Sequence, residues 1–202
     1  MSNQPIETVK TIPAILSRMK SYGKDSAFFW KGQEHSYDDF FEMCSRWEGQ
    51  LSDLGVGHAT VCSVLGDYSP ETCALFFALI KRKAILVPFT PENVPELPEL
   101  MNIAGVQCQF TFSGDEEHTF EWFKGAKENE LVNSFKERNE SGLIVFTSGS
   151  TGRPKGIMHD CERVFRKFLK PRTAWRTVLF LKMDHFGGFN TLLSTVSNGG
   201  LG

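Results

Sequence analysis

Residues 61–89 read VCSVLGDYSPETCALFFALIKRKAILVPF, and their pattern decides the expected fold. Residues 61–65 are apolar and rich in β-branched side chains, which is typical of a buried strand. A helix should begin at Ser69, because Ser is a good N-cap and Pro70 fits the first helical turn, where an N–H has no partner. This helix is apolar on nearly every side and should be buried. Residues 84–89 complete a strand–helix–strand unit, which predicts two parallel strands joined by a helix.

The same alternation continues on both sides of this unit. Ser36 and Asp39 form an S-x-x-D pattern that predicts a helix start, and Gly55 should end that helix. Further strands are expected at residues 27–30, 106–112, 143–147 and 177–181, and further helices at residues 96–104 and after each of the last two strands. The expected fold class is therefore α/β, with mostly parallel sheets and flanking helices.

Residues 113–140 interrupt this alternation. They are acidic, rich in turn-forming residues and weakly periodic, which is typical of a solvated surface connection. We expect one helix in them, between residues 120 and 135. The chain is thus predicted to comprise a first α/β subdomain (1–112), an acidic connecting segment (113–140) and the start of a second subdomain (141–202).

Composition excludes several classes of function. The 22 basic and 24 acidic side chains give a net charge of −2, so no nucleic-acid partner is expected. The first ten residues contain no signal-like apolar run, and the longest apolar run, residues 73–80, is far shorter than the roughly 20 residues of a membrane span. The composition therefore predicts a soluble, cytoplasmic protein.

The five cysteines form no C-x-x-C pair, and their odd number argues against a disulfide framework. Each is expected to be a small buried side chain in a reducing compartment. His35, His58, His118 and His159 show no ligand spacing, so we expect no metal site built from protein side chains.

Residues 147–156, TSGSTGRPKG, carry the chemistry. Four hydroxyls and three glycines follow an apolar strand, and Lys155 stands three residues past the second glycine. Glycines let backbone N–H groups approach a ligand, hydroxyls donate to phosphate oxygens, and the ammonium group supplies positive charge. The spacing differs from the Walker pattern G-x-x-x-x-G-K-[ST]. A Ser/Gly-rich linker is the alternative, but the buried strand and the rigid Pro154 favour a polyphosphate-binding loop.

This stretch resembles the phosphate-loop signature of the adenylate-forming superfamily, which includes acyl-CoA synthetases, luciferases and peptide-synthetase adenylation domains. The family pattern, T-S-G-[ST]-T-G-x-P-K-G, is matched at every position. Residues 36–40 (SYDDF) and 83–89 (KAILVPF) resemble weaker family segments. The resemblance implies the front part of the large N-terminal domain of an acyl-adenylate-forming enzyme.

A second, weaker similarity lies at residues 183–188, MDHFGG, which resemble the family segment P-L-F-H-x-x-G. His185 and Gly188 hold the H-x-x-G spacing. In the family this His or an aromatic residue lies between the acyl pocket and the thiol tunnel. A His satisfied in a turn at a strand end is the alternative, and the sequence leaves both interpretations open.

The resemblance implies a reaction in two halves. A carboxylate attacks the α-phosphate of ATP to give acyl-AMP and pyrophosphate, with Mg²⁺ neutralising the phosphates, and a thiol of coenzyme A or carrier-protein pantetheine then displaces AMP. Lys155 and His185 are the implied catalytic residues. The implied phosphate-binding residues are Thr147, Ser148, Gly149, Ser150, Thr151, Gly152 and Lys155. Gly149 and Gly152 act as backbone hinges.

The implied substrate is a small carboxylic acid, and an acyl carrier protein is a possible partner. Amino-acid-activating relatives place an aspartate where Phe186 stands here, so the resemblance predicts an acid without an α-ammonium group. On a strand-like backbone neighbouring side chains point to opposite faces, so we expect Asp184 and His185 to face opposite sides and Asp184 not to reach the same pocket.

The family's Y-G-x-T-E and T-G-D segments are absent. We therefore expect the chain to be a fragment that is inactive alone, with half of the nucleotide site missing. A naturally short, non-catalytic nucleotide-binding or regulatory relative is the alternative, and a phosphotransferase with a convergent loop is a weaker one.

Overall fold

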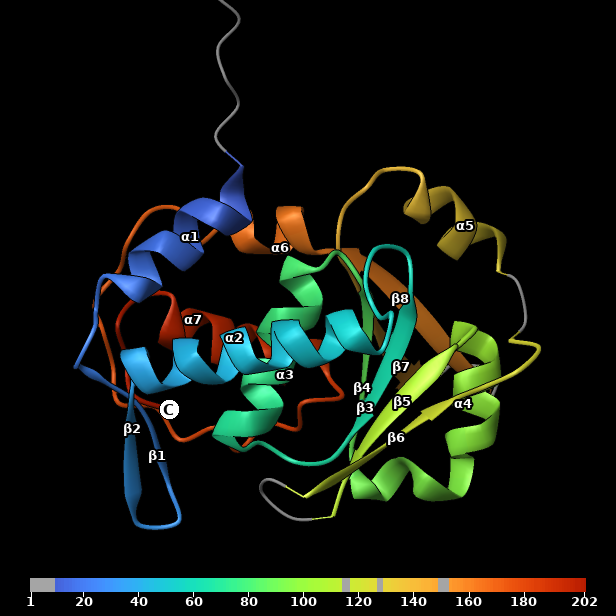
Figure 1. The fold of residues 1–202 in the computed structure, drawn as a ribbon, viewed down its shortest axis with the longest axis horizontal. Helices are drawn as coiled ribbons and strands as arrows, with labels where there is room; N and C mark the ends of the chain where they lie inside the picture. Colours follow the sequence, from blue (N-terminus) through green and yellow to red (C-terminus); the bar gives the residue numbers. More distant parts are fainter. Residues whose placement is uncertain (1–9, 114–116, 127–128, 149–152) are drawn as a thin grey trace, which may run out of the picture.

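The computed structural model describes residues 10–113, 117–126, 129–148 and 153–202. Its main feature is a six-stranded sheet with the order β6-β5-β3-β4-β7-β8. The central pairs β3–β4, β3–β5 and β4–β7 are parallel, and the outer pairs β5–β6 and β7–β8 are antiparallel (Figure 1). The strands are β3 (Val61–Leu65), β4 (Ile85–Phe89), β5 (Cys108–Phe112), β6 (His118–Trp122), β7 (Gly142–Ser148) and β8 (Pro154–Asp160). This confirms the predicted α/β class with a mostly parallel sheet.

Helices cover both faces of this sheet, and each face has its own hydrophobic core. The larger core lies under α1 (Thr11–Lys20), α2 (Tyr37–Asp53), α3 (Pro70–Lys81), α6 (Cys161–Arg166) and α7 (Phe186–Val196). The smaller core lies under α4 (Leu97–Ala104) and α5 (Glu130–Lys136), and a 3₁₀ helix, η1 (Pro91–Glu96), precedes α4. Neighbouring strand residues serve opposite cores, as Val61 and Cys62 show, because side chains alternate along a strand.

The helix starts follow from their sequence signals. Ser36 accepts a hydrogen bond from the backbone N–H of Asp39, and the Asp39 carboxylate accepts one from the backbone N–H of Ser36, which completes a capping box for α2. Ser69 caps α3 with Pro70 in its first turn. Gly55 follows α2 with a φ of 71°, a left-handed conformation that glycine adopts readily. These three predictions are confirmed.

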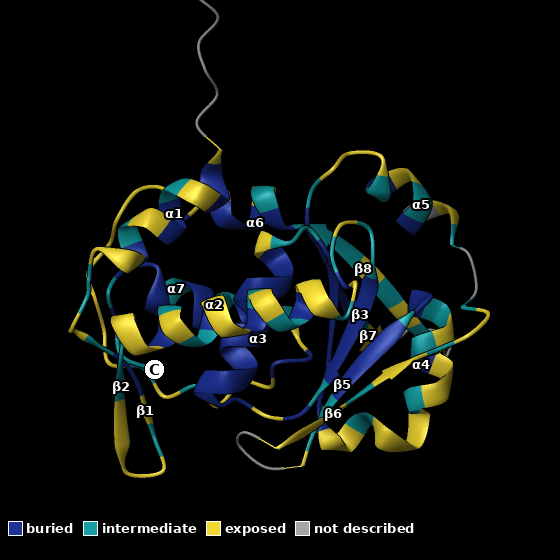
Figure 2. Cartoon of the chain, viewed as in Figure 1, coloured by how far each residue is buried: buried dark blue, intermediate teal, exposed yellow. Residues whose placement is uncertain are grey.

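Helix α3 is the most deeply buried element. Every residue from Pro70 to Ile80 is buried, and Figure 2 shows nearly all of this helix in the buried colour where it crosses behind α2. All five cysteines are buried and unpaired, as the sequence predicted.

A separate antiparallel hairpin, β1 (Ser26–Trp30) and β2 (Gln33–Ser36), lies beside the C-terminal residues (Figure 1). The backbone N–H of Gly202 donates to Ala27 O at 3.0 Å, and that of Phe29 donates to Gly202 O at 2.9 Å. Leu201 forms a parallel bridge with Arg176. The end of the chain therefore lies between β1 and the extended segment around Arg176.

The strand predicted at residues 177–181 is wrong. Among the described residues, the β-pairing found here is a single bridge at the edge of the segment, between Arg176 and Leu201. Val178 and Phe180 are each 79% exposed. A strand requires a hydrogen-bonded neighbour, and β-branched composition alone does not supply one.

The region between β5 and α6 also differs from expectation. The helix expected after residues 143–147 is α6, but the chain first returns as the antiparallel strand β8, which the sequence did not predict. Residues 113–140 contain β6 as well as the short helix α5, and Phe120 packs on Phe110 with ring centroids 4.7 Å apart. This segment therefore adds a strand to the sheet that β7 joins, and the division at 1–112, 113–140 and 141–202 stays a prediction.

Candidate functional site

The candidate phosphate loop connects the two strands of the β7–β8 hairpin. In the register of this hairpin Thr147 lies opposite Lys155, and Ser148 lies opposite Pro154. Residues 149–152, which hold the predicted binding residues Gly149, Ser150, Thr151 and Gly152, lie outside the described residues. The structure thus places the two ends of the predicted loop on adjacent strands.

Thr147 and Lys155 are both exposed and share one face of the hairpin, because directly opposed residues of an antiparallel pair point to the same side. Val145, two residues before Thr147, is buried in the larger core. The hydroxyl and the ammonium group therefore lie on the side of the sheet that carries α3, α6 and α7.

Close packing on the opposite side of the hairpin explains the last glycine of the motif. A Cβ built on Gly156 would lie 3.3 Å from Ile144 Cγ2 and 3.4 Å from a ring carbon of Phe146. Phe146 in turn stacks on Phe89 of β4, with centroids 5.9 Å apart. The glycine thus lets the hairpin pack tightly where the loop leaves it.

The H-x-x-G segment begins α7: His185 is the N-cap, residues 186–188 form the first helical turn, and a tight turn at residues 183–184 precedes them. A Cβ built on Gly188 would lie 2.1 Å from the carbonyl oxygen of Lys182, so only glycine fits this approach of helix and turn. The Lys182 ammonium lies 3.3 Å from a carboxylate oxygen of Glu92 in η1. Since η1 follows β4 directly, this ion pair ties the turn to the carboxyl end of a central parallel strand.

The expectation that Asp184 and His185 face opposite sides is wrong. Asp184 Oδ1 lies 2.5 Å from His185 Nδ1. The two residues belong to a turn before α7 and not to a strand, so the alternation rule does not apply. The Asp184 side chain is 8% exposed and that of His185 is 65% exposed, which places a buried carboxylate behind an accessible imidazole.

An aromatic contact joins the first residue of α7 to β8. The ring of His159 stacks on Phe186 with centroids 4.4 Å apart, and the Lys167 ammonium lies 5.2 Å from the Phe186 ring centroid. Burial, and after it the Lys167 charge, lower the pKa of His159. Because residues 155 and 159 lie on the same face of β8, the structure brings the phosphate-loop strand and the residue next to His185 to one side of the sheet.

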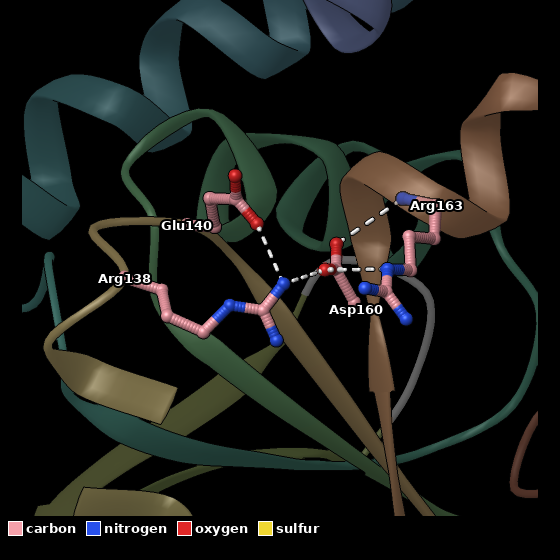
Figure 3. Close-up of polar contacts among 4 residues, drawn as sticks. All are labelled: Arg138, Glu140, Asp160 and Arg163. Carbon is pink, nitrogen blue, oxygen red and sulfur yellow. Dashed lines mark hydrogen bonds and ion pairs between the residues drawn. The ribbon is translucent and has the colours of Figure 1, made fainter. Parts of the chain in front are cut away.

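A charged cluster fixes the other end of β8 (Figure 3). Asp160 caps α6 by accepting from the backbone N–H of Arg163 at 3.1 Å, and it pairs with the Arg138 guanidinium. Glu140 lies 3.4 Å from Arg138. Its carboxyl pKa is raised, mainly by burial and then by the Asp160 charge. This cluster therefore stabilises the end of β8 that is far from the phosphate loop, and the candidate site lies at the other end of the strand.

A pocket of about 370 Å³ lies between β1, the start of α3 and residues 176–179. The sequence did not predict it, since its walls come from distant segments. Tyr68 and Trp30 line it. The Tyr68 hydroxyl and Trp30 Nε1 are buried without a hydrogen-bond partner among the described residues. Burial raises the pKa of Tyr68, and the charges of Cys73, Asp67 and Asp184 raise it further.

Two further findings concern the described ranges alone. They contain no group of three or more His, Cys, Asp or Glu side chains that could hold a metal ion. None of the helices in them has the length and apolar character that crossing a membrane requires.

The fold and the hairpin motif are those of adenylate-forming enzymes, and comparison with known proteins agrees. Residues 17–201 match the model of the AMP-binding enzyme family, and the chain belongs to this family. It is 23% identical over 202 residues to 2-succinylbenzoate–CoA ligase of Listeria monocytogenes, covering 90% of this chain and 42% of the ligase. It is 27% identical over 175 residues to D-alanine–D-alanyl carrier protein ligase of Streptococcus pneumoniae, covering 79% of this chain and 33% of that ligase.

Solved structures show the same fold. The N-terminal domain of FACL13 from Mycobacterium tuberculosis has a TM-score of 0.72 at 17% identity, with 95% of this chain and 56% of that chain covered. The N-terminal subdomain of Klebsiella oxytoca NpsA also has a TM-score of 0.72, at 18% identity, with 96% and 52% covered. The chain thus spans about half of these structures and less than half of the curated relatives.

Proposed function

We propose that this chain takes part in the ATP-dependent activation of a carboxylic acid as acyl-AMP, followed by thioester formation to coenzyme A or to carrier-protein pantetheine. Family membership and two ligase relatives, one named for coenzyme A and one for a carrier protein, support this proposal. The chain covers less than half of those relatives, so the proposal concerns the activity of the whole protein.

The observation that carries the proposal is the paired exposure of Thr147 and Lys155 on one face of the β7–β8 hairpin. A hydroxyl and an ammonium group at the two ends of a glycine-containing connection are suitable donors for phosphate oxygens. We assign the phosphate contacts to Thr147, Ser148, Ser150, Thr151 and Lys155, with Gly149 and Gly152 allowing close backbone approach.

In this proposal Lys155 offsets the negative charge of the β- and γ-phosphates of ATP, so that pyrophosphate leaves more readily. Mg²⁺ is usually held by a few carboxylates together with substrate phosphates, and it would neutralise further phosphate charge. We assign His185 to the second half of the reaction, in which the thiol displaces AMP. Phe186 next to it contacts His159 and Lys167, and its apolar ring supports an acid without an α-ammonium group.

The test is acid-dependent exchange of pyrophosphate into ATP, measured on the protein at its full natural length with aryl, fatty and amino acids. Lys155→Ala should lower exchange on the order of 100-fold, because one donor to developing charge is lost. Its unfolding free energy should change by less than about 0.5 kcal/mol, because the side chain is exposed. Lys20→Ala, at an exposed position on α1, is the matched control and should leave exchange unchanged.

Wild-type exchange by Lys155→Ala would rule out Lys155 as a phosphate ligand. If the wild-type protein bound ATP but none of the acids supported pyrophosphate exchange, the non-catalytic nucleotide-binding alternative would replace this proposal.

A further inference from the structure

The contact between Asp184 and His185 carries an inference about proton transfer. We propose that Asp184 is a positioning residue that accepts the Nδ1–H of His185 and thereby presents the bare Nε2 of the imidazole outward, where it takes the proton of the incoming thiol. The part concerning the thiol rests on the proposed function. The part concerning the imidazole tautomer rests on the geometry alone.

Burial of the carboxylate favours one direction for this hydrogen bond. The Asp184 side chain is 8% exposed, and a buried carboxylate requires a donor to offset its lost hydration. Among the described residues, the hydrogen-bond partner of Asp184 is His185 Nδ1, at 2.5 Å. An ionised carboxylate can only accept, so Nδ1 carries the hydrogen, and in the neutral ring Nε2 then has the free lone pair.

The backbone around the pair is held from several sides. The buried side chain of Met183 anchors the turn, and the Lys182–Glu92 ion pair ties it to η1. The backbone N–H of His185 donates to Lys182 O at 3.2 Å, and that of Phe189 donates to His185 O at 3.2 Å. The orientation of the imidazole is therefore set by the fold and by Asp184 together.

The titratable groups around the pair have environments or partners of their own. They are Tyr68 and Asp67 after β3, Lys182 in the turn, and His159 and Lys167 around Phe186. Burial raises the pKa of Tyr68, so it stays a neutral hydroxyl. Asp67 is exposed and accepts a hydrogen bond from the backbone N–H of Tyr68 at 2.7 Å.

In the thiol step, the S–H proton moves to His185 Nε2 while sulfur forms a bond with the acyl carbon of acyl-AMP. The bond between that carbon and the phosphate oxygen breaks, and AMP leaves with the electron pair. The imidazolium so formed keeps its Nδ1–H on the Asp184 carboxylate, whose negative charge stabilises it. Release of the Nε2 proton to solvent, for which the exposed ring is suited, restores the neutral form.

The first test measures the tautomer by ¹⁵N NMR of the chain at mildly alkaline pH, with the His185 signals identified by their loss in His185→Gln. Wild-type His185 should be in the Nδ1–H form. Asp184→Asn should shift the population toward the Nε2–H form, and Asp184→Glu should restore the Nδ1–H form. Asp67→Asn is the matched control and should leave the wild-type tautomer. An Nε2–H tautomer in the wild type, or no shift in Asp184→Asn, would overturn the proposal.

The second test separates the two halves of the reaction in the full-length protein. Asp184→Asn should slow thioester formation by on the order of 100-fold, the usual effect of losing a general base, and leave pyrophosphate exchange near wild type. Equal losses in both halves would reject a role in the thiol step. Absence of exchange in the wild type would instead reject the proposed function, while the tautomer result would stand on its own.

Discussion

Residues 61–112 and residues 173–188 are both rich in apolar side chains, and the sequence predicts strands in both. In the first region β3 has parallel neighbours on both sides, and the helix after it is buried from Pro70 to Ile80. In the second region residues 177–181 form no strand, and Val178 and Phe180 are 79% exposed. The difference teaches that an apolar run becomes a strand only when the fold supplies hydrogen-bonding partners for it.

The strongest way to break this comparison is to remove the same ring from each region. Phe76 in α3 is fully buried, so Phe76→Ala should cost about 3–5 kcal/mol of unfolding free energy through lost burial and a cavity. Phe180→Ala should change it by less than about 0.5 kcal/mol, because the ring is already in solvent. Urea denaturation of both variants measures the difference. Equal losses would mean that Phe180 packs against something in solution, and the comparison would fail.

A smaller loss of stability is expected inside the second region, at its closely packed end around Gly188. Gly188→Ala places a Cβ 2.1 Å from the Lys182 carbonyl oxygen and should cost about 1–3 kcal/mol through forced backbone movement. Gly187→Ala is the matched control, since its Cβ would meet only Leu181 Cδ1 at 3.7 Å, an ordinary contact. Thermal melting of the two variants checks this, and a Gly188→Ala protein as stable as the control would contradict the close approach.

The smallest effect concerns the contact between the second region and the sheet. Because the pKa of His159 is lowered in the folded protein by burial and then by Lys167, the unfolded chain binds more protons there. The resulting contribution of His159 to the unfolding free energy is present above the ordinary pKa of 6.5. It is lost as the pH falls below that value, and the loss is complete below the pKa of the folded protein. His159→Phe should keep the stack on Phe186 and reduce the loss of stability between neutral and mildly acidic pH.

Denaturation of the wild type and of His159→Phe, at neutral and at mildly acidic pH, measures this difference. An unchanged pH dependence would show that other groups account for all of it.

Much of the chain before residue 112 could be predicted because its signals are local. Ser36, Ser69 and Gly55 each determine a helix end through their own conformational and hydrogen-bonding preferences. β8 was missed because Pro154 and Gly156 resemble loop residues, and its pairing with β7 appears only once the hairpin register is known.

The candidate site likewise has features that the sequence predicted and features that it did not. The motif at residues 147–156 identified the loop, but the shared face of Thr147 and Lys155 depends on strand register, which the motif does not contain. The Asp184–His185 contact was missed because a strand was assumed. The turn that creates it depends on the approach of Gly188 to the Lys182 carbonyl, and residue preference alone does not reveal such a contact.

The five cysteines have a practical consequence. All of them are buried, and burial raises the pKa of Cys161 to about 12, so at neutral pH the native chain offers no reactive thiolate there. The rate at which a thiol reagent modifies the chain should therefore report how often the native structure opens. A single cysteine placed at the exposed Val178 would be the preferred attachment point for a fluorescent probe, without removal of the natural five.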